Sequence, residues 1–593
     1  MNPETKQCQN CKQDFVIQSE DFDFYKKVGV PAPTFCPECR FQRRLTWRNE
    51  WQIFKKADVH GNEIFSGFHR DSPVKIMKVE EWFSDSWDSL ATGRDYDFTK
   101  PFFVQMQELL KVAPIIARSL TKPVNSEYCT NASGPKNCYL SFGISYSENC
   151  TYVIWSARAK DCMDCHMIFD SELCYGCVNM VKCYSSLFSF DCESCDNVIL
   201  SKNLVGCSNC FGCVGLKNKS YYIFNQPYSK EEYVKKLQEF NMGSRENFEK
   251  LYQEAAALWL TFPHKYIHGV HNVNAVGEYI KDSKNALYCY RVIGAEDVKY
   301  CQNFTLGPAK DSYDHSNFGD GSELVYETLV AGNQASNIKF CSQCYASVSN
   351  LQYSIYCLGA SNLFGCVGVR AKQYCILNKQ YTKEEYEELV PKIIQHMNDM
   401  PYVDAKGRVY KYGEFFPSEL SPYAYNETSA YQEFWPLTKQ EALEKGFTWR
   451  EPEKRDYATT IASADLPDSI ADAQDSITKE VIGCQHEGTC NHQCATAFKI
   501  LALELEFYKK HNIPLPLLCP NCRHAERLTH RNPPKLWQRH CSCIGEASDD
   551  GIYKNQTKHF HDVEECPNEF ETSYAPDRPE IVYCEGCYNS EVA

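Results

Sequence analysis

The sequence lacks any long apolar stretch. No run of about eighteen apolar residues occurs in its 593 residues, so we expect no membrane-spanning segment and no membrane partner. The N-terminal residues MNPETKQCQNCKQDF contain no apolar core of a secretory signal. A chain with 34 cysteines and no export signal is expected in a reducing, cytoplasmic compartment. There, clustered cysteines bind metal or lie buried as thiols rather than form disulfides.

Positive charge and recognisable catalytic motifs are also scarce. The chain has 62 Lys and Arg against 77 Asp and Glu, and its net charge of −15 argues against a generally basic nucleic-acid coat. It contains no P-loop, no GxSxG, no HExxH and no dinucleotide-binding glycine fingerprint. With 43% hydrophobic and 13% aromatic residues the chain should fold, and we expect it not to be an enzyme.

An internal duplication dominates the middle of the chain. FGCVGLKNKSYYIFNQPYSKEEYVKKL, from Phe211, matches FGCVGVRAKQYCILNKQYTKEEYEELV, from Phe364. Upstream, Cys138 corresponds to Cys289. A repeat of this kind fixes the architecture before anything else is assigned, but it does not fix the activity.

Short apolar runs recur within each copy at intervals of about 12 to 15 residues, separated by Asn, Asp, Gly and Ser. Such spacing is typical of stacked short strands. Each copy ends in a helix that begins with a capping box, at Ser229 and at Thr382. The predicted fold is mainly β with helices: zinc ribbons at both ends, and two tandem β-solenoid-like cysteine-rich units each capped by a helix.

The N-terminal residues have the spacing of a zinc ribbon. Cys8-x2-Cys11 and Cys36-x2-Cys39 are separated by 24 residues. Two such knuckles can present four thiolates tetrahedrally to one Zn²⁺ and stabilise a module too small for its own core.

A second ribbon lies near the C-terminus. Cys519-x2-Cys522 is its second knuckle, and we predict a widened first knuckle, Cys490-x3-Cys494. Three further residues are close enough to compete as ligands: Cys484, His486 and His492, with His492 the main alternative to Cys490.

FYKKVGVPAPTFCPECR, from Phe24, and FYKKHNIPLPLLCPNCR, from Phe507, follow these first knuckles. This pattern resembles the "probable zinc-ribbon" family of small bacterial proteins. The resemblance implies a second ribbon, recognisable here in Cys566, Cys584 and Cys587, although Val563 stands where its first cysteine belongs. We predict that Cys541 supplies the missing ligand; Cys543 and His561 are the alternatives.

The frame of that second ribbon also appears once more, after the N-terminal ribbon. There Ala57, His60, Lys78 and Glu81 occupy the ligand positions, so we expect a relic without metal. The chain as a whole resembles uncharacterised bacterial cysteine-rich proteins flanked by "probable zinc-ribbon" domains. That resemblance is carried by WFSDSWD (from Trp82), GRDYDFTKPFF (from Gly93) and the block that starts with NCYLSFG (from Asn137).

Thirteen cysteines lie between Cys129 and Cys213, several of them as CxxC. Where the first copy has Cys162, the second has Ser312, so the fold does not need that thiol. We therefore favour an inward-facing ladder of thiols over a row of metal sites. If metal does bind, Cys192, Cys195, Cys341 and Cys344 are the best candidates.

Two aspartates also recur in both copies: Asp161 with Asp164, and Asp311 with Asp314. They are either turn-forming residues or an acid–base pair like those of carbohydrate-active β-helices.

Basic, aromatic-bearing stretches follow both ribbons. Arginine beside an aromatic ring suits a phosphate backbone and unstacked bases. The predicted nucleic-acid-binding residues are Arg40, Arg43, Arg44, Arg48, Arg523, Arg527, Arg531 and Arg539. RNA, DNA or the ribosome is thus the predicted partner. The alternatives are a protein-interaction scaffold that uses the solenoid surface and, third, a carbohydrate-active enzyme. These arginines could instead form a solvated face or pair with the acidic middle of the chain.

The predicted functional sites are therefore metal-binding sites, which together hold about three zinc ions. Their ligands are Cys8, Cys11, Cys36, Cys39, Cys490, Cys494, Cys519, Cys522, Cys541, Cys566, Cys584 and Cys587. The predicted segments are 1–56 (ribbon), 57–82 (relic), 83–127 (helical connector), 128–260 (solenoid unit 1), 284–398 (solenoid unit 2), 399–483 (linker), 484–540 (ribbon) and 541–593 (second ribbon).

Overall fold

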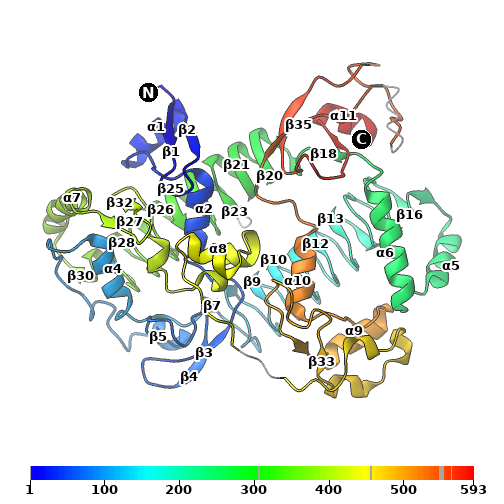
Figure 1. The fold of residues 1–593 in the computed structure, drawn as a ribbon, viewed down its shortest axis with the longest axis horizontal. Helices are drawn as coiled ribbons and strands as arrows, with labels where there is room; N and C mark the ends of the chain where they lie inside the picture. Colours follow the sequence, from blue (N-terminus) through cyan, green and yellow to red (C-terminus); the bar gives the residue numbers. More distant parts are fainter. Residues whose placement is uncertain (1, 305–306, 454–456, 546–552, 563, 593) are drawn as a thin grey trace. The chain divides into compact units, whose positions relative to one another are not determined.

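The computed structural model describes residues 2–304, 307–453, 457–545, 553–562 and 564–592 (Figure 1). The chain divides into two units, each made of two separate segments. Unit 1 contains residues 1–119 and 267–450, and unit 2 contains residues 120–266 and 451–593. The two units therefore interleave along the sequence. We call the four segments in which the sequence predicts a ribbon or its relic module A (1–56), module B (57–82), module C (484–540) and module D (541–593).

Unit 2 contains a stack of parallel strands, which we call ladder 1. A seven-stranded sheet has the order β13-β12-β11-β10-β9-β8-β7, and a four-stranded sheet has the order β14-β15-β16-β17. Figure 1 shows the strands from β9 to β13 following one another. The strands are β7 (Leu120–Thr121), β8 (Ala132–Ser133), β9 (Phe142–Ser145), β10 (Ile154–Ala157), β11 (His166–Phe169), β12 (Val178–Val181), β13 (Phe190–Glu193), β14 (Asp196–Ile199), β15 (Ser208–Phe211), β16 (Ser220–Ile223) and β17 (Gln226–Pro227).

Ladder 1 repeats every twelve residues. Ile154 of β10 pairs with His166 of β11, and His166 pairs with Val178 of β12. Within each twelve-residue rung the backbone turns at a fixed interval, because every third residue from Asn137 to Phe224 has a φ between 43° and 66°. None of the residues at these positions is Val, Ile, Thr or Pro, since β-branched side chains and the proline ring do not fit the left-handed region. Each twelve-residue rung therefore consists of four straight sides of three residues, with a turn between one side and the next.

The residue that follows each turn points into the ladder. Cysteines 138, 150, 162, 165, 174 and 177 all occupy this position and are buried. Cys162 donates a hydrogen bond to the carbonyl of Lys160 at 3.2 Å. In the other ladder Ser312, which corresponds to Cys162, makes the same bond to Lys310 at 2.8 Å. Serine and cysteine are therefore interchangeable here, and the predicted inward placement of these thiols is confirmed.

Unit 1 contains ladder 2, a twelve-stranded sheet in which neighbouring strands are again mostly parallel. Its rungs are less regular: Lys284 pairs with Glu296, but Ala295 pairs with Ala309. Its strands are β19 (Gly269–Val270), β20 (Val273–Lys281), β21 (Lys284–Ile293), β22 (Ala295–Lys299), β23 (Gln302–Phe304), β24 (Ala309–Ser316), β25 (Ser322–Leu329), β26 (Ser336–Lys339), β27 (Ser349–Gln352), β28 (Ser361–Phe364), β29 (Gln373–Ile376) and β30 (Lys379–Gln380).

A helix follows each ladder where the sequence predicts one. Ser229 caps α5 (Lys230–Phe240), which packs on β16, and Thr382 caps α7 (Lys383–Asp399), which packs on β29. In both, the backbone N–H of the N3 glutamate donates to the N-cap hydroxyl and the N-cap backbone N–H donates to the N3 carboxylate, so the two capping boxes are confirmed. A further helix, α6 (Arg245–Trp259), is capped by Ser244.

Short strands and helices form the modules and connectors. Unit 1 has β1 (Glu4–Gln7), β2 (Asp14–Ile17), α1 (Ser19–Val28), α2 (Pro37–Leu45), β3 (Phe54–Ala57), β4 (Glu63–Ser66), β5 (Ile76–Met77), α3 (Val79–Trp82), α4 (Phe102–Leu110), β6 (Ile115–Ile116), β31 (Tyr402–Val403), β32 (Val409–Tyr410) and α8 (Lys439–Glu444). Unit 2 has β18 (His264–Lys265), β33 (Ile482–Gly483), β34 (Ala497–Phe498), α9 (Ala502–His511), α10 (Pro520–Leu528), β35 (Trp537–His540), β36 (Glu569–Thr572), β37 (Val582–Tyr583) and α11 (Glu585–Val592).

The predicted linker 399–483 contains several single turns of helix. These are the 3₁₀ helices Ser418–Leu420, Tyr425–Glu427, Ser463–Asp465, Ile470–Asp472 and Asp475–Lys479, and the π-helix Ala430–Phe434. The fold is thus mainly β with helices and has cysteine-rich modules towards both ends of the chain, as predicted.

Substitution of Asn149 tests the backbone requirement of ladder 1. Asn149 has a φ of 53°, and its amide joins Asn137 and Asp161 on the neighbouring rungs. Asn149→Val should lower the free energy of unfolding by about 1–3 kcal/mol, because a β-branched residue is strained there. Asn149→Gly loses the same side-chain bonds without the strain and should cost less in urea unfolding. Equal losses in the two variants would show that the amide bonds alone matter.

Candidate metal centres

Module A brings together the four cysteines predicted to bind metal. Cys8 follows β1, Cys36 caps α2, and Cys39 lies in the first turn of that helix. The sulfurs of these residues and of Cys11 all lie within 4.8 Å of one another. The Sγ atoms of Cys11 and Cys36 are 3.7 Å apart.

These separations fit a shared metal ion rather than disulfides. Four thiolates at about 2.3 Å from a tetrahedral centre lie about 3.8 Å from one another, whereas a disulfide bond is about 2.05 Å long. The four cysteines of module A are free thiols. Module A therefore has the ligand number and spacing of a closed tetrahedral site.

In module C the group of four cysteines differs from the predicted set in one member. It consists of Cys484, Cys494, Cys519 and Cys522, so Cys484 takes the place predicted for Cys490. The reason is the length of the first knuckle. Gln485, which follows Cys484, donates its backbone N–H to Leu517, as Gln9 after Cys8 does to Thr34. Cys484 is thus the counterpart of Cys8, and the knuckle is widened much further than predicted.

In module D, Cys541 lies with the three cysteines of the predicted second ribbon. Cys541, Cys566, Cys584 and Cys587 form its four-cysteine group, and the sulfurs of Cys566 and Cys584 are 3.8 Å apart. Val563 lies outside the described residues. In module B the corresponding positions hold a direct contact instead, since Nε2 of His60 lies 2.7 Å from Oε1 of Glu81.

Hydrogen bonds favour the thiolate form of one cysteine in each four-cysteine group. Hydrogen bonds from Cys36 and Cys39 lower the pKa of Cys8. A hydrogen bond from Cys522 lowers the pKa of Cys519 to about 5, and one from Cys541 lowers the pKa of Cys584. The thiolate is the form that binds metal.

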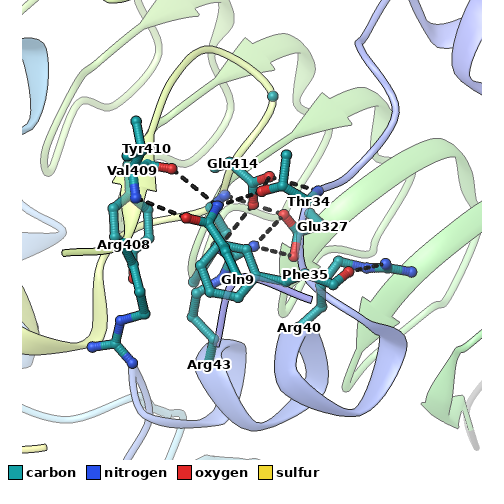
Figure 2. Close-up of polar contacts among 12 residues, drawn as sticks. Gln9, Thr34, Phe35, Arg40, Arg43, Glu327, Arg408, Val409, Tyr410 and Glu414 are labelled. Atoms are coloured by element: carbon teal, nitrogen blue, oxygen red, sulfur yellow. Dashed lines mark hydrogen bonds and ion pairs between the residues drawn. The ribbon is translucent and has the colours of Figure 1, made fainter. Parts of the chain in front are cut away.

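The arginines of α2, predicted to face nucleic acid, are buried in unit 1. Arg40 and Arg44 both bind Asp314 of β24, at 2.8 Å and 3.0 Å. Arg43 binds Glu327 of β25 and Glu414, at 2.8 Å and 2.9 Å. Figure 2 shows Arg43 between these two carboxylates and beside Phe35. These ion pairs fix α2 on ladder 2.

The arginines of α10 repeat this arrangement in unit 2. Arg523 and Arg527 bind Asp164, at 2.9 Å and 3.0 Å. Arg523 also lies 3.6 Å from Glu504 of α9, and burial raises the pKa of that carboxyl to about 7. The two recurring aspartates Asp164 and Asp314 thus have the same role: each holds two arginines of a cysteine module on a ladder.

The other predicted arginines are also engaged within the units. Arg48 is buried and pairs with Glu50 at 2.6 Å. Arg531 is buried beside His166, and half-buried Arg539 donates to the carbonyl of Ala575. Seven of the eight predicted residues are thus buried and Arg539 is half-buried, so they do not form exposed basic patches. The alternative, pairing with acidic residues in the middle of the chain, is found for Arg40, Arg43, Arg44, Arg523 and Arg527. Nucleic-acid contact itself stays a prediction.

The cysteines of the ladders are arranged differently from those of the modules. In the described part of the chain, every group of side chains with metal-binding geometry lies in module A, C or D. Cys192 and Cys195, like Cys341 and Cys344, occupy successive inward positions of a ladder. Their CxxC spacing therefore follows from the three-residue side of a rung and is not by itself a sign of a metal knuckle.

Comparison with known proteins gives little guidance. No known protein family and no curated protein matches this chain. A solved structure from Desulfovibrio desulfuricans, described as a proposed acetyltransferase, is 10% identical with a TM-score of 0.09, over 50% of this chain and 87% of its own. That similarity is too low to support an argument about fold or activity. Among the described residues, no helix has both the length and the apolar composition needed to cross a bilayer.

Substitution of two aspartates of β24 tests the buried ion pairs. Asp314→Ala leaves Arg40 and Arg44 buried without their carboxylate and should lower the free energy of unfolding by about 3–5 kcal/mol. Asp311 on the same strand binds Lys27 at 2.8 Å in a half-exposed pair, so Asp311→Ala should cost about 0–1 kcal/mol. Chemical denaturation compares the two. Equal losses would contradict the assignment of Asp314 as the anchor of module A.

Proposed function

We propose that this protein is a zinc-binding, non-enzymatic β-solenoid scaffold that binds a protein partner. The observation that carries this proposal is the burial of the module arginines. Arg40, Arg44, Arg523 and Arg527 are at most 8% exposed and are used to hold their own ladders. A residue already paired with a buried carboxylate is not available to a phosphate backbone.

Zinc is the metal that the ligands favour. Modules A, C and D each present four cysteine sulfurs with tetrahedral spacing, which is the donor set of structural zinc sites. A closed site of four cysteines leaves no open position for a substrate or water. The three groups therefore support three structural zinc ions.

The regularity of the ladders supports the solenoid interpretation. In ladder 1 parallel strands recur every twelve residues, buried cysteines occupy inward positions, and a helix follows the last rung. In such folds the long outer sides serve as binding surfaces. In ladder 1 the outer side chains include Tyr146, which is 68% exposed, and a row of charges in which Lys136 binds Glu148 at 2.6 Å. An exposed aromatic residue beside paired charges suits a protein partner.

The positions of the recurring aspartates argue against an enzyme. Asp164 is buried and holds two arginines, whereas Asp161 accepts a hydrogen bond from Asn149 at the surface. An acid–base pair needs both carboxyl groups to reach one substrate bond. Asp311 and Asp314 are separated in the same way, between an exposed lysine and two buried arginines.

Metal removal tests the zinc centres. We expect the purified full chain to contain zinc, and Cys39→Ser to lose one ion and to destabilise module A, because a serine oxygen does not replace the thiolate. The matched control is Cys357→Ser in ladder 2, where cysteine and serine make the same inward bond. Elemental analysis measures the number of zinc ions per chain in both variants. A lower zinc content in Cys357→Ser would show that the ladders also hold metal.

A pull-down with and without nuclease tests the partner. A protein that stays bound to the tagged full chain after nuclease, together with no micromolar, salt-dependent binding of single-stranded RNA, is the expected result. Salt-dependent RNA binding by the folded chain would contradict the scaffold proposal. Charge reversal of Arg44 or Arg527 does not test it, because both residues are buried and the substitution would also destabilise the fold.

A further inference from the structure

Seven-ligand clusters occur in modules C and D, where the four-cysteine groups do not account for all the metal-binding side chains. In module C, His486, Cys490 and His492 gather around Cys522, and their ligand atoms lie within 4.8 Å of one another. In module D, Cys543, His559 and His561 gather around Cys587 in the same way. Each additional group has two cysteines and two histidines, which is the second common donor set of tetrahedral zinc.

Each additional group shares one sulfur with the four-cysteine group of its module. The Sγ atom of Cys522 lies 3.9 Å from that of Cys484, a member of the first group, and 3.7 Å from that of Cys490, a member of the second. Both separations match two thiolates on one tetrahedral ion. We propose that Cys522 and Cys587 each bridge two zinc ions, so that modules C and D hold binuclear centres built from five cysteines and two histidines. This inference rests on the proposed zinc identity of the four-cysteine groups.

The additional ligands lie in insertions within the first knuckle. In module A two residues separate Cys8 from Cys11, whereas nine separate Cys484 from Cys494 and 24 separate Cys541 from Cys566. Within each of the two insertions lie one cysteine and two histidines of the cluster. Two insertions of different length and sequence thus supply the same set of three ligands. Module A has no insertion in its first knuckle. Among the described residues it has a four-cysteine group and no second group of ligands.

The histidines of module D are oriented by outer contacts in the manner of metal ligands. Nε2 of His559 lies 2.8 Å from the Glu591 carboxylate, which leaves Nδ1 at 3.2 Å from the sulfur of Cys543. Nδ1 of His561 donates to the carbonyl of Glu564 at 2.7 Å, so its Nε2, at 3.2 Å from the sulfur of Cys587, carries the lone pair. A carboxylate or carbonyl behind the ring is the usual outer partner of a zinc-bound histidine.

The histidines of module C have fewer outer contacts. The rings of His486 and His492 lie 5.5 Å apart. Nδ1 of His486 is buried without a hydrogen-bond partner in the part of the chain that the structure describes. A buried nitrogen of this kind costs free energy unless it is paired, and a metal ion would satisfy it.

The two bridging cysteines occupy the same structural position. Cys522 is the third residue of α10 and Cys587 the third residue of α11. Cys39, their counterpart in α2, accepts a hydrogen bond from the Asn10 amide at 3.2 Å instead. In module A an amide therefore satisfies the sulfur that a second ion would share in module C.

The zinc content of the intact full chain, measured by native mass spectrometry and elemental analysis, tests the proposal. We expect five ions per chain: one in module A and two each in modules C and D. The paired variants His486→Ala/His492→Ala and His559→Ala/His561→Ala should each contain four. The control His60→Ala/His271→Ala, at two exposed histidines outside the clusters, should keep five.

A count of three in the wild type, unchanged in the histidine variants, would overturn the binuclear centres and leave the four-cysteine centres standing. A count of zero would overturn both. Cobalt(II) substitution of the wild type tests the shared sulfur without depending on the folding of a variant. Antiferromagnetic coupling through a common thiolate should reduce the EPR intensity per cobalt ion below that of isolated ions. Five ions with uncoupled cobalt would overturn the bridge.

Discussion

The structure depends on one buried interaction that occurs twice: an aspartate of a ladder holds two arginines of a module helix. Asp314 holds Arg40 and Arg44, and Asp164 holds Arg523 and Arg527. Charges taken out of water are costly unless every partner is in place. Arg40, which pairs with Asp314, directly follows Cys39, the last cysteine of the four-cysteine group in module A. Metal binding and the ion pairs therefore fix the same helix turn from its two sides.

The duplication in this chain is larger than the repeat in the middle of the sequence. Each unit combines a cysteine module, a degenerate or complete second module, and a ladder with its following helix. The aromatic contacts repeat as well, since Tyr25 lies against Tyr326 in unit 1 and Tyr508 lies against Tyr175 in unit 2. The N-terminal module belongs to the second ladder and the C-terminal module to the first. The order of the parts along the chain thus differs from their grouping into units.

Features set by local residues could be predicted from the sequence, and features set by long-range packing could not. The capping boxes, the helix after Ser244 and the close grouping of the module A cysteines follow from short patterns. The three-residue period of the ladders was hidden, because cysteine, serine, alanine and valine all fit its inward positions. Burial of Arg40 could not be inferred from its own stretch, since its partner Asp314 lies 274 residues away. A recurring aspartate at 164 and 314 was the available signal.

The interleaved order of the units has a consequence for synthesis on the ribosome. Arg40 is made 274 residues before Asp314, an interval of about 14–55 s at translation rates of 5–20 residues per second. During that time module A has no ladder to pack on, and metal binding alone can hold its fold. In unit 2 the order is reversed, because Asp164 and the rest of ladder 1 are made before Arg523. A nascent chain therefore first carries α2 without its aspartate, and it carries Asp164 without its arginine partners until Arg523 and Arg527 are made.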